Sequence, residues 1–319
     1  MSLLYCGIDE AGYGPMLGPL CVAAAAFAID DWTPGEPAPD LWSLLDGAVC
    51  HSIKGAGKRI PIADSKKLKL ANGGTRDPLT HLERGVLASL SAWDDVPEHD
   101  GALFDHLGTQ LGPEPWYEVG NTDLPRSTTG GGIRIDGNML RRAGATAGVR
   151  LVGLWCIALC EQDYNALIRE HGTKAATTAL ASRRLIGRVL EHGYPGAVRI
   201  VCDRQGGRQH YARSISGIAG RGDAKTLDEH ERLSRYALDE RTTVSFMPEA
   251  EDHHLPVALA SMTAKLVREL AMARFNQYWG QRIPGLRGTA GYTTDARRWL
   301  TDAKPSLDAE TRAKLVRLA

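Results

Sequence analysis

The chain has 319 residues, of which 43% are hydrophobic and 24% are charged, and this near-average composition excludes wholesale disorder and collagen-like repetition. The 38 lysines and arginines balance 38 acidic residues, which excludes a basic coat that binds nucleic acid through bulk charge, but not a local basic patch. The longest apolar runs, Leu20–Ile29 and Leu151–Cys160, are too short to cross a membrane, which takes about 18 residues.

The start of the chain lacks a basic segment and already carries carboxylates at Asp9 and Glu10, which argues against a signal peptide. Several of the six cysteines lie inside apolar runs, which is typical of reduced core thiols. We therefore expect a cytoplasmic protein with no membrane partner.

The first two predicted strands form a hairpin. Leu3–Ile8 is apolar and runs directly into Asp9 and Glu10, and a glycine-rich turn separates it from the apolar run Leu20–Ile29. Periodicity alone does not distinguish a helix from a strand in a run of that length. The turn residues favour a second strand that pairs with the first.

Two segments of opposite charge follow the hairpin. Residues 31–60 contain several prolines and glycines, which indicates a surface excursion. Residues 54–69 carry six basic side chains and one acid, whereas residues 81–120 carry eight acids and one arginine. The acidic stretch also contains Trp93 and Trp116, so we interpret it as a folded insertion with a solvated face.

Strands and helices alternate through the rest of the chain. The predicted order is a strand at Val149–Leu159, a helical stretch from about Asp163 to His192 interrupted near Gly172, a strand at Ala197–Cys202, a polar helix near Ala224–Leu238, a strand at Thr242–Met247 and a helix from Pro256 to about Tyr278. This order predicts an α/β fold with a mixed central β-sheet flanked by helices and with an inserted middle region.

Three of the predicted strands end in acidic residues: Asp9 and Glu10 after the first, Asp203 after the fourth, and Glu251 or Asp252 after the fifth. Strand ends that lie side by side would gather these carboxylates at one edge of the sheet. Like charges crowded there raise each other's pKa unless a cation neutralises them. Hard oxygen ligands of this kind suit Mg²⁺ or Mn²⁺, and two such ions can activate a water and stabilise the leaving oxygen of a phosphodiester.

Several segments of the chain resemble the type II ribonucleases H, in the order in which that family has them. Gly7–Pro19 reads GIDEAGYGPMLGP, where the family has a G-[IV]-D-E-A-G-R-G-P-x-x-G-P run. The other segments are Ala63–Leu68 (ADSKKL), Val201–Asp203 (VCD), Ala260–Lys265 (ASMTAK) and Gly291–Thr294 (GYTT), which is similar to a G-Y-x-T segment near the family's C-terminal end.

This resemblance implies a ribonuclease H-like fold that hydrolyses the RNA strand of RNA–DNA hybrids, with divalent metal held by Asp9, Glu10, Asp203 and one of Glu251 and Asp252. Counting forward to Pro256 selects Asp252, whereas counting back from the ASMTAK segment selects Glu251. We prefer Asp252, because the proline fixes the strand-to-helix turn and the family has an aspartate there. The resemblance also implies one ribonuclease H-like domain over residues 1–300, with insertions at about 31–60 and 75–145, and a helical tail at 301–319.

The resemblance assigns substrate contacts to two of these segments. In relatives the backbone of the glycine turn, here Gly12-Tyr13-Gly14, reads the 2′-hydroxyl at the cut site, and glycine lets the chain approach closely. Tyr13 replaces the family's arginine, which removes its phosphate or junction contact. In the second segment, Ser65 is expected to contact substrate, and Lys66 and Lys67 to neutralise phosphates.

Other residues are candidates on their own chemistry. Tyr292 is expected to stack on a sugar or base. Arg204 and the arginines after it form either a second phosphate-binding edge beside Asp203 or a solvated loop. The His253-His254 pair is weak evidence for zinc, because a pair without further spaced ligands does not make a site. Cys156 and Cys160 are expected in the core.

Three functions are compatible with these patterns. The first is a Mg²⁺- or Mn²⁺-dependent endonuclease that cuts RNA in hybrids or single ribonucleotides in duplex DNA. The second is a nuclease of the same fold that acts on DNA. The third is a nucleic-acid-binding protein that has lost catalysis, but a pure binder gains nothing from carboxylates that face phosphate.

Overall fold

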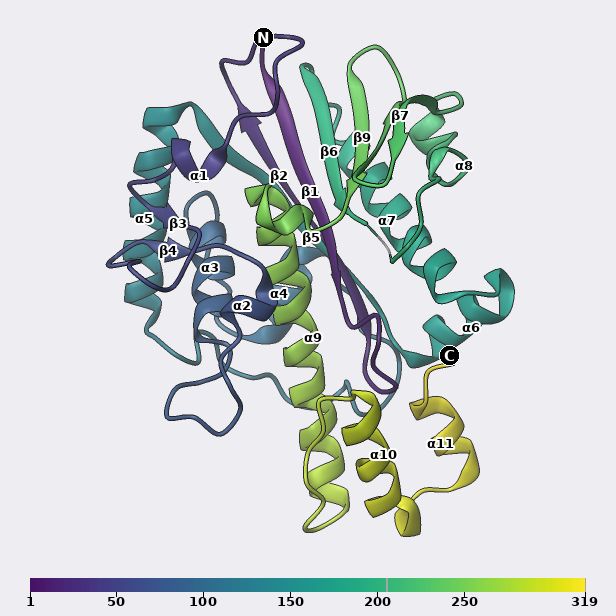
Figure 1. Cartoon of the computed structure of the whole chain (residues 1–319). Helices are drawn as coiled ribbons and strands as arrows, with labels where there is room; N and C mark the ends of the chain where they lie inside the picture. The colour runs from purple at the N-terminus through teal and green to yellow at the C-terminus, as the bar shows by residue number, and fades with distance from the viewer. Residues whose placement is uncertain (205, 319) are drawn as a thin grey trace.

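A seven-stranded mixed sheet forms the centre of the computed structural model, which describes residues 1–204 and 206–318 (Figure 1). Its strand order is β5-β2-β1-β6-β9-β8-β7. The strands are β1 (Leu3–Ala11), β2 (Leu20–Ile29), β5 (Val149–Leu159), β6 (Ala197–Asp203), β7 (Lys225–His230), β8 (Leu233–Ala237) and β9 (Thr242–Met247). β1 pairs antiparallel with β2 and parallel with β6, and β9 is parallel to β6. The predicted α/β fold with a mixed sheet and an N-terminal hairpin is confirmed.

Helices cover both faces of this sheet. The helices are α1 (Leu41–Leu44), α2 (Ser65–Leu68), α3 (Thr80–Ser91), α4 (Asp100–Leu107), α5 (Gly130–Ala147), α6 (Glu161–His171), α7 (Lys174–Glu191), α8 (Ala212–Ile215), α9 (Leu255–Arg282), α10 (Thr293–Asp302) and α11 (Ala309–Leu315), with short 3₁₀ turns at η1 (Ile218–Gly220), η2 (Ala250–Asp252) and η3 (Lys304–Ser306). A separate two-stranded ladder joins β3 (Val49–Cys50) to β4 (Ile60–Pro61). No helix among the described residues is long and apolar enough to cross a membrane.

The alternation of side chains along β1 explains the two layers. Leu3 and Tyr5 belong to the core that contains α9, whereas Leu4, Cys6 and Ile8 belong to the core that contains α7. Successive side chains of a strand point to opposite faces, so a strand covered on both sides is apolar throughout. This is why the first predicted strands read as continuous apolar runs.

Gly7 lets α9 come directly against β1. A Cβ atom at this position would lie 2.0 Å from the backbone nitrogen of Val257 and 2.2 Å from the carbonyl carbon of Pro256. No side chain fits at such distances, so the start of α9 packs on bare backbone two residues before Asp9. The close approach brings the chain before α9, including η2, to the carboxyl ends of β1 and β6.

One predicted element is wrong. The segment near Ala224–Leu238 is not a polar helix but the hairpin of β7 and β8, which extends the sheet beyond β9. Ser234 and Tyr236 are buried while their neighbours Leu233 and Arg235 are not, which is the two-residue period of a strand on the sheet. This segment forms the exposed outer edge of the sheet and carries many charged residues, so the sequence does not show the alternation of apolar and polar residues that is typical of a strand.

The middle region and the end of the chain pack onto the same body. Leu82, Leu103 and Leu140, from α3, α4 and α5, share a core with β1 and α9. Trp299 of α10 and Leu315 of α11 pack against the far half of α9. The proposed division at residue 300 stays a prediction; α10 runs across that position, and of the predicted tail Ala319 lies outside the described residues.

Candidate active site

The parallel pairing of β1 with β6 places the first carboxylates together. Ile8 lies opposite Cys202 in the register, so Asp9 of β1 lies beside Asp203, the last residue of β6, at the same edge of the sheet. Asp9 is 7% exposed, and the Asp203 carboxylate accepts a hydrogen bond of 3.1 Å from the backbone nitrogen of Ala250. The latter bond ties the end of β6 to η2, and so fixes where the next acidic residues lie.

Glu251, and not Asp252, joins this cluster. Glu251 is 7% exposed, and burial and the charge of Asp203 raise the pKa of its carboxyl group. The Asp252 side chain instead forms an ion pair with Lys67, with oxygen–nitrogen distances of 2.6 and 2.7 Å. Adjacent residues in the tight turn of η2 point in different directions, so the structure places Glu251 with Asp9, Glu10 and Asp203, and Asp252 with Lys67. Which of Glu251 and Asp252 is a metal ligand stays a prediction.

Burial and mutual repulsion raise the pKa of all four carboxyl groups. Burial raises the pKa of Asp9 well above its usual range, and the fields of Glu10, Asp203 and Glu251 raise it further. Burial and then the charge of Asp203 raise the pKa of both Glu10 and Glu251 to about 7. The pKa of Asp203 is also raised, mainly by burial. Near neutral pH the cluster therefore carries protons that a divalent cation would displace.

The donor set fits a hard divalent cation in type and charge. Four carboxylates offer only oxygen ligands, and Oε2 of Glu251 is buried without a hydrogen-bond partner. As the side chains stand, no group of three His, Cys, Asp or Glu residues within 1–204 and 206–318 is arranged to hold one ion. Binding an ion therefore requires the carboxylates to rotate toward a common centre.

Lys66 of α2 lies beside the cluster. Burial acts to lower the pKa of Lys66, but the charges of Asp64, Glu251, Asp9 and Asp203 outweigh burial and raise it. Asp64 caps α2 by accepting a 3.0 Å hydrogen bond from the backbone nitrogen of Lys66. Ser65 is buried and accepts a 3.0 Å hydrogen bond from Ser261 of α9. The ADSKKL segment thus brings one cation to the carboxylates, while Lys67 binds Asp252.

The glycine turn follows Glu10 directly. Gly12 has a φ of +94°, which strains any residue with a side chain, and a Cβ atom there would meet Nε of Arg268 at 2.6 Å. Tyr13 and Gly14 are exposed at the surface. The amides of Met16 and Leu17, further along the turn, both donate to the carbonyl of Gly291. The next residue, Tyr292, therefore lies close to the turn.

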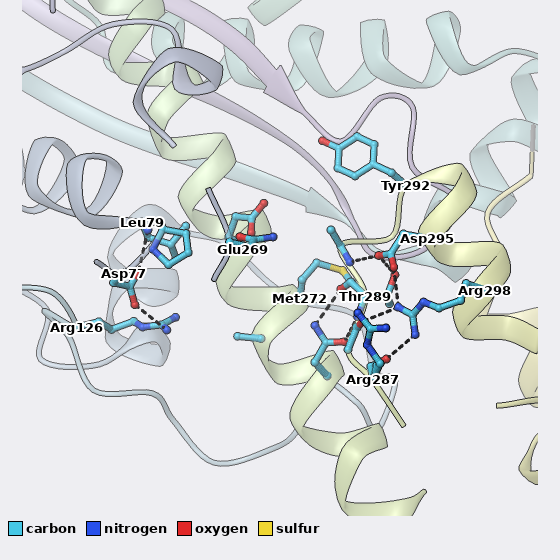
Figure 2. A pocket seen from close by; sticks show the side chains of 16 residues that line it. Asp77, Leu79, Arg126, Glu269, Met272, Arg287, Thr289, Tyr292, Asp295 and Arg298 are labelled. Carbon is cyan, nitrogen blue, oxygen red and sulfur yellow. Dashed lines mark hydrogen bonds and ion pairs between the residues drawn. The ribbon is translucent and has the colours of Figure 1, made fainter. Parts of the chain in front are cut away.

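Tyr292 stands at one end of a cavity of about 590 Å³ (Figure 2). Its ring is 46% exposed and lies 5.4 Å from the guanidinium of Arg268 and 5.7 Å from the Lys265 ammonium. Figure 2 shows the ion pairs Asp77–Arg126 and Asp295–Arg298 on either side of α9. None of the four clustered carboxylates lines this cavity, so it is a separate feature of the surface.

The arginines after Asp203 are bound to their own loop and hairpin. Arg204 donates to the carbonyls of Glu231 and His230 and to the Ser234 hydroxyl. Arg208 lies over the ring of Tyr211, at 4.9 Å. The structure therefore uses Arg204 to hold the turn between β7 and β8 and does not bring its guanidinium to the carboxylates.

The histidine pair and the cysteines have structural surroundings. His254 contacts the Tyr5 hydroxyl and Sδ of Met247, and burial, followed by the neighbouring His253, lowers the pKa of His254 to about 4. The ring is therefore neutral at physiological pH and packed in place. Cys156 and Cys160 are buried, as expected.

Sequence reasoning missed the charged side chains beneath the glycine turn. Glu161 is fully buried, and its carboxylate accepts a 2.9 Å hydrogen bond from the backbone nitrogen of Gly18. Arg268 is also fully buried and donates to the carbonyls of Leu17 and Ala290. Glu161 follows a predicted strand closely, so the rule that selected Asp9 and Asp203 would also have selected it. Arg268 lies within a predicted apolar helix and carries no such signal.

Comparison with known proteins finds similarity to solved structures. No family model matches the sequence, and no curated protein matches it. The chain is similar to RNase HII from Archaeoglobus fulgidus, in a structure titled as its complex with PCNA, at 17% identity with 99% of this chain and 94% of that chain covered and a TM-score of 0.47. It is also similar to Bst-RNase HIII in complex with Mn²⁺ (17% identity, 99% and 66% covered, TM-score 0.43) and to ribonuclease H2 from Pyrococcus horikoshii OT3 (16%, 99% and 92%, TM-score 0.39). All three of these solved structures are of ribonucleases H.

Proposed function

We propose that this protein is a divalent-metal-dependent endonuclease that hydrolyses the RNA strand of RNA–DNA hybrids, or ribonucleotides within duplex DNA. One observation carries the proposal: Asp9, Glu10, Asp203 and Glu251 meet at one edge of the sheet, where burial and their mutual charges raise the pKa of each, with Lys66 beside them. Four crowded carboxylates cost stability, whereas phosphodiester hydrolysis by metal ions needs such a set.

The residues of the chain divide the chemistry between them. Asp9, Glu10, Asp203 and Glu251 would hold Mg²⁺ or Mn²⁺, which, when bound, supply an activated water and stabilise the charge on the leaving oxygen. Lys66, already close to the carboxylates, is placed to bind a phosphate of the strand that enters the site.

Substrate choice is assigned to the glycine turn. The turn begins directly after Glu10, and its exposed residues Tyr13 and Gly14 lie next to the metal-binding edge. Backbone amides that reach the minor groove distinguish RNA from DNA by contacting the 2′-hydroxyl. Tyr292, exposed beside the turn, is the candidate for stacking on a sugar or base. These positions favour RNA in a hybrid over an all-DNA duplex.

A cleavage assay with matched duplexes tests the proposal. RNA–DNA, DNA–DNA and single-ribonucleotide duplexes of one sequence are incubated with Mg²⁺ or Mn²⁺, beside a control with EDTA. We expect cleavage of the first and third substrates only, and only with metal.

The Asp9→Asn variant separates catalysis from binding. It removes one ligand and one charge without a change of shape, so it should abolish cleavage and retain binding of the hybrid. Equal cleavage of the DNA duplex would support the DNA-nuclease alternative. No cleavage by the wild type, together with tight hybrid binding, would support a binding protein that has lost catalysis.

A further inference from the structure

The far end of the chain returns to the glycine turn. The backbone nitrogen of Arg317 donates to the carbonyl of Met16 at 2.9 Å. On either side of Arg317, Asn165 of α6 bonds the carbonyl of Val316 at 2.8 Å and the amide of Leu318 at 2.7 Å. Figure 1 shows the chain after α11 returning to α6. This segment is far in sequence from the N-terminal hairpin that carries the glycine turn. Residues 316–318 are therefore docked against the glycine turn and α6.

The Arg317 side chain binds the inner side of the turn. Its guanidinium donates to the carbonyls of Gly12 at 2.6 Å, Gly18 at 3.4 Å and Tyr13 at 3.4 Å. It stacks 3.9 Å from the centre of the Tyr164 ring and is only 4% exposed. Within the described residues it forms no ion pair with a carboxylate, so this buried cation is directed to backbone carbonyls. Burying a charged side chain that binds only neutral groups lowers the stability of the fold, and a well-packed apolar side chain in its place would stabilise the fold more.

The geometry of the peptide plane shows what these bonds do. In a trans peptide the carbonyl of one residue and the amide of the next point in opposite directions. The carbonyls of Gly12 and Tyr13 face inward to Arg317, so the amides of Tyr13 and Gly14 face outward. Among the described residues neither amide has an acceptor within the protein. Two free donors are thus aimed at the surface, immediately after Asp9 and Glu10.

We propose that Arg317 is a positioning residue, which holds the Gly12-Tyr13-Gly14 backbone so that two amides face the 2′-hydroxyl and phosphate of the substrate. The inference rests on the proposed nuclease function and adds a residue from the opposite end of the chain to it. Arg317 touches neither substrate nor metal and acts only through the turn. Glu161 and Arg268 brace the same turn at Gly18 and Leu17, whereas Arg317 binds the carbonyls of Gly12 and Tyr13.

Chemical rescue of the Arg317→Ala variant tests the proposal. Removal of the side chain leaves a guanidinium-sized space beneath the turn, so hybrid cleavage should fall roughly 10- to 100-fold, as for a catalytic group that is misplaced by about 1 Å. Millimolar guanidinium should restore much of that activity and leave the wild type unchanged. The matched control is Arg312→Ala, an exposed arginine on α11, which should retain wild-type activity with or without guanidinium.

The outcomes are distinct. Wild-type activity in a folded Arg317→Ala variant, or a loss that guanidinium does not reverse, would overturn the positioning role and leave the proposed function intact. Absence of cleavage by the wild type would refute the proposed function itself. If Arg317→Ala does not fold, Arg317→Lys keeps the charge but not the three-carbonyl contact. That variant should bind Mn²⁺ normally, as measured by a thermal shift, and cleave the hybrid poorly; wild-type cleavage by it would refute the inference.

Discussion

The metal-free protein should lose stability as the pH rises, and Glu251→Gln should reduce that loss. Folding raises the pKa of Glu251 from 4.5 to about 7, by burial and by the charge of Asp203. A folded state that binds the proton more tightly than the unfolded state gains stability below the unfolded pKa of 4.5. That gain disappears as the pH rises through the folded pKa of about 7.

The magnitude follows from the two pKa values. Their difference of about 2.5 corresponds to about 3 kcal/mol at 1.36 kcal/mol for each unit of pKa, and most of it is lost between pH 5 and pH 8. A glutamine has the shape of the protonated glutamic acid and cannot ionise. The variant should therefore be more stable than the metal-free wild type at pH 8 by on the order of 2 kcal/mol, and close to it at pH 5.

Urea unfolding followed by tryptophan fluorescence, in EDTA at pH 5 and pH 8, measures this difference. Asp252→Asn is the matched control, because it changes the adjacent residue but removes only the partly exposed pair with Lys67, worth about 1 kcal/mol or less. Its pH dependence should follow that of the wild type. Addition of Mn²⁺ at pH 8 should stabilise the wild type more than Glu251→Gln, since the variant lacks one ligand. An identical pH dependence for the wild type and Glu251→Gln would refute the carboxylate cluster.

Three further predictions follow from the site and its supports. Glu251→Gln should abolish hybrid cleavage while Asp252→Asn keeps it within a few-fold, and the opposite result in initial-rate assays would restore Asp252 as the fourth carboxylate. Gly7→Ala should lower the free energy of unfolding by about 3 kcal/mol or more, because its Cβ would lie 2.0 Å from the Val257 backbone, whereas Gly47→Ala, with open space around it, should change stability little in the same urea titration. Tyr13→Arg should raise the initial rate on a single-ribonucleotide duplex relative to the continuous hybrid, and an unchanged ratio would show that position 13 does not set specificity.

The sequence predicted the parts of the fold that depend on local pattern. The apolar runs of β1 and β2 are buried on both faces, so their continuous hydrophobicity identified them directly. The hairpin of β7 and β8 was missed because it lies at the sheet edge, where charged side chains cover an exposed strand and no strong period is left.

The sequence predicted which strands carry the acidic residues of the site. A parallel register makes the ends of β1 and β6 neighbours, and this follows from the order of the elements. The choice between Glu251 and Asp252 depends on the turn of η2, where Glu249 adopts a φ of +54° and the next residues wind into a single 3₁₀ turn. Counting residues from either flank cannot show which of these two side chains faces the cluster, because neighbouring residues in this turn point in different directions.

The pairing partners of β1 also determine when the site can exist during folding. β2 follows β1 at once, but β6 brings Ala197 opposite Leu3, and the brace on the glycine turn comes from Arg317. Contacts so distant in sequence form slowly, because closing the long loops between them costs conformational entropy before the contacts contribute any stability. Until β6 arrives, one edge of β1 stays unpaired and open to association with other chains. A chain truncated before β6 should therefore expose the unpaired edge of β1 and associate with other chains. A chain truncated just before Arg317 should retain all four carboxylates but lack the hydrogen bonds from Arg317 to the glycine turn.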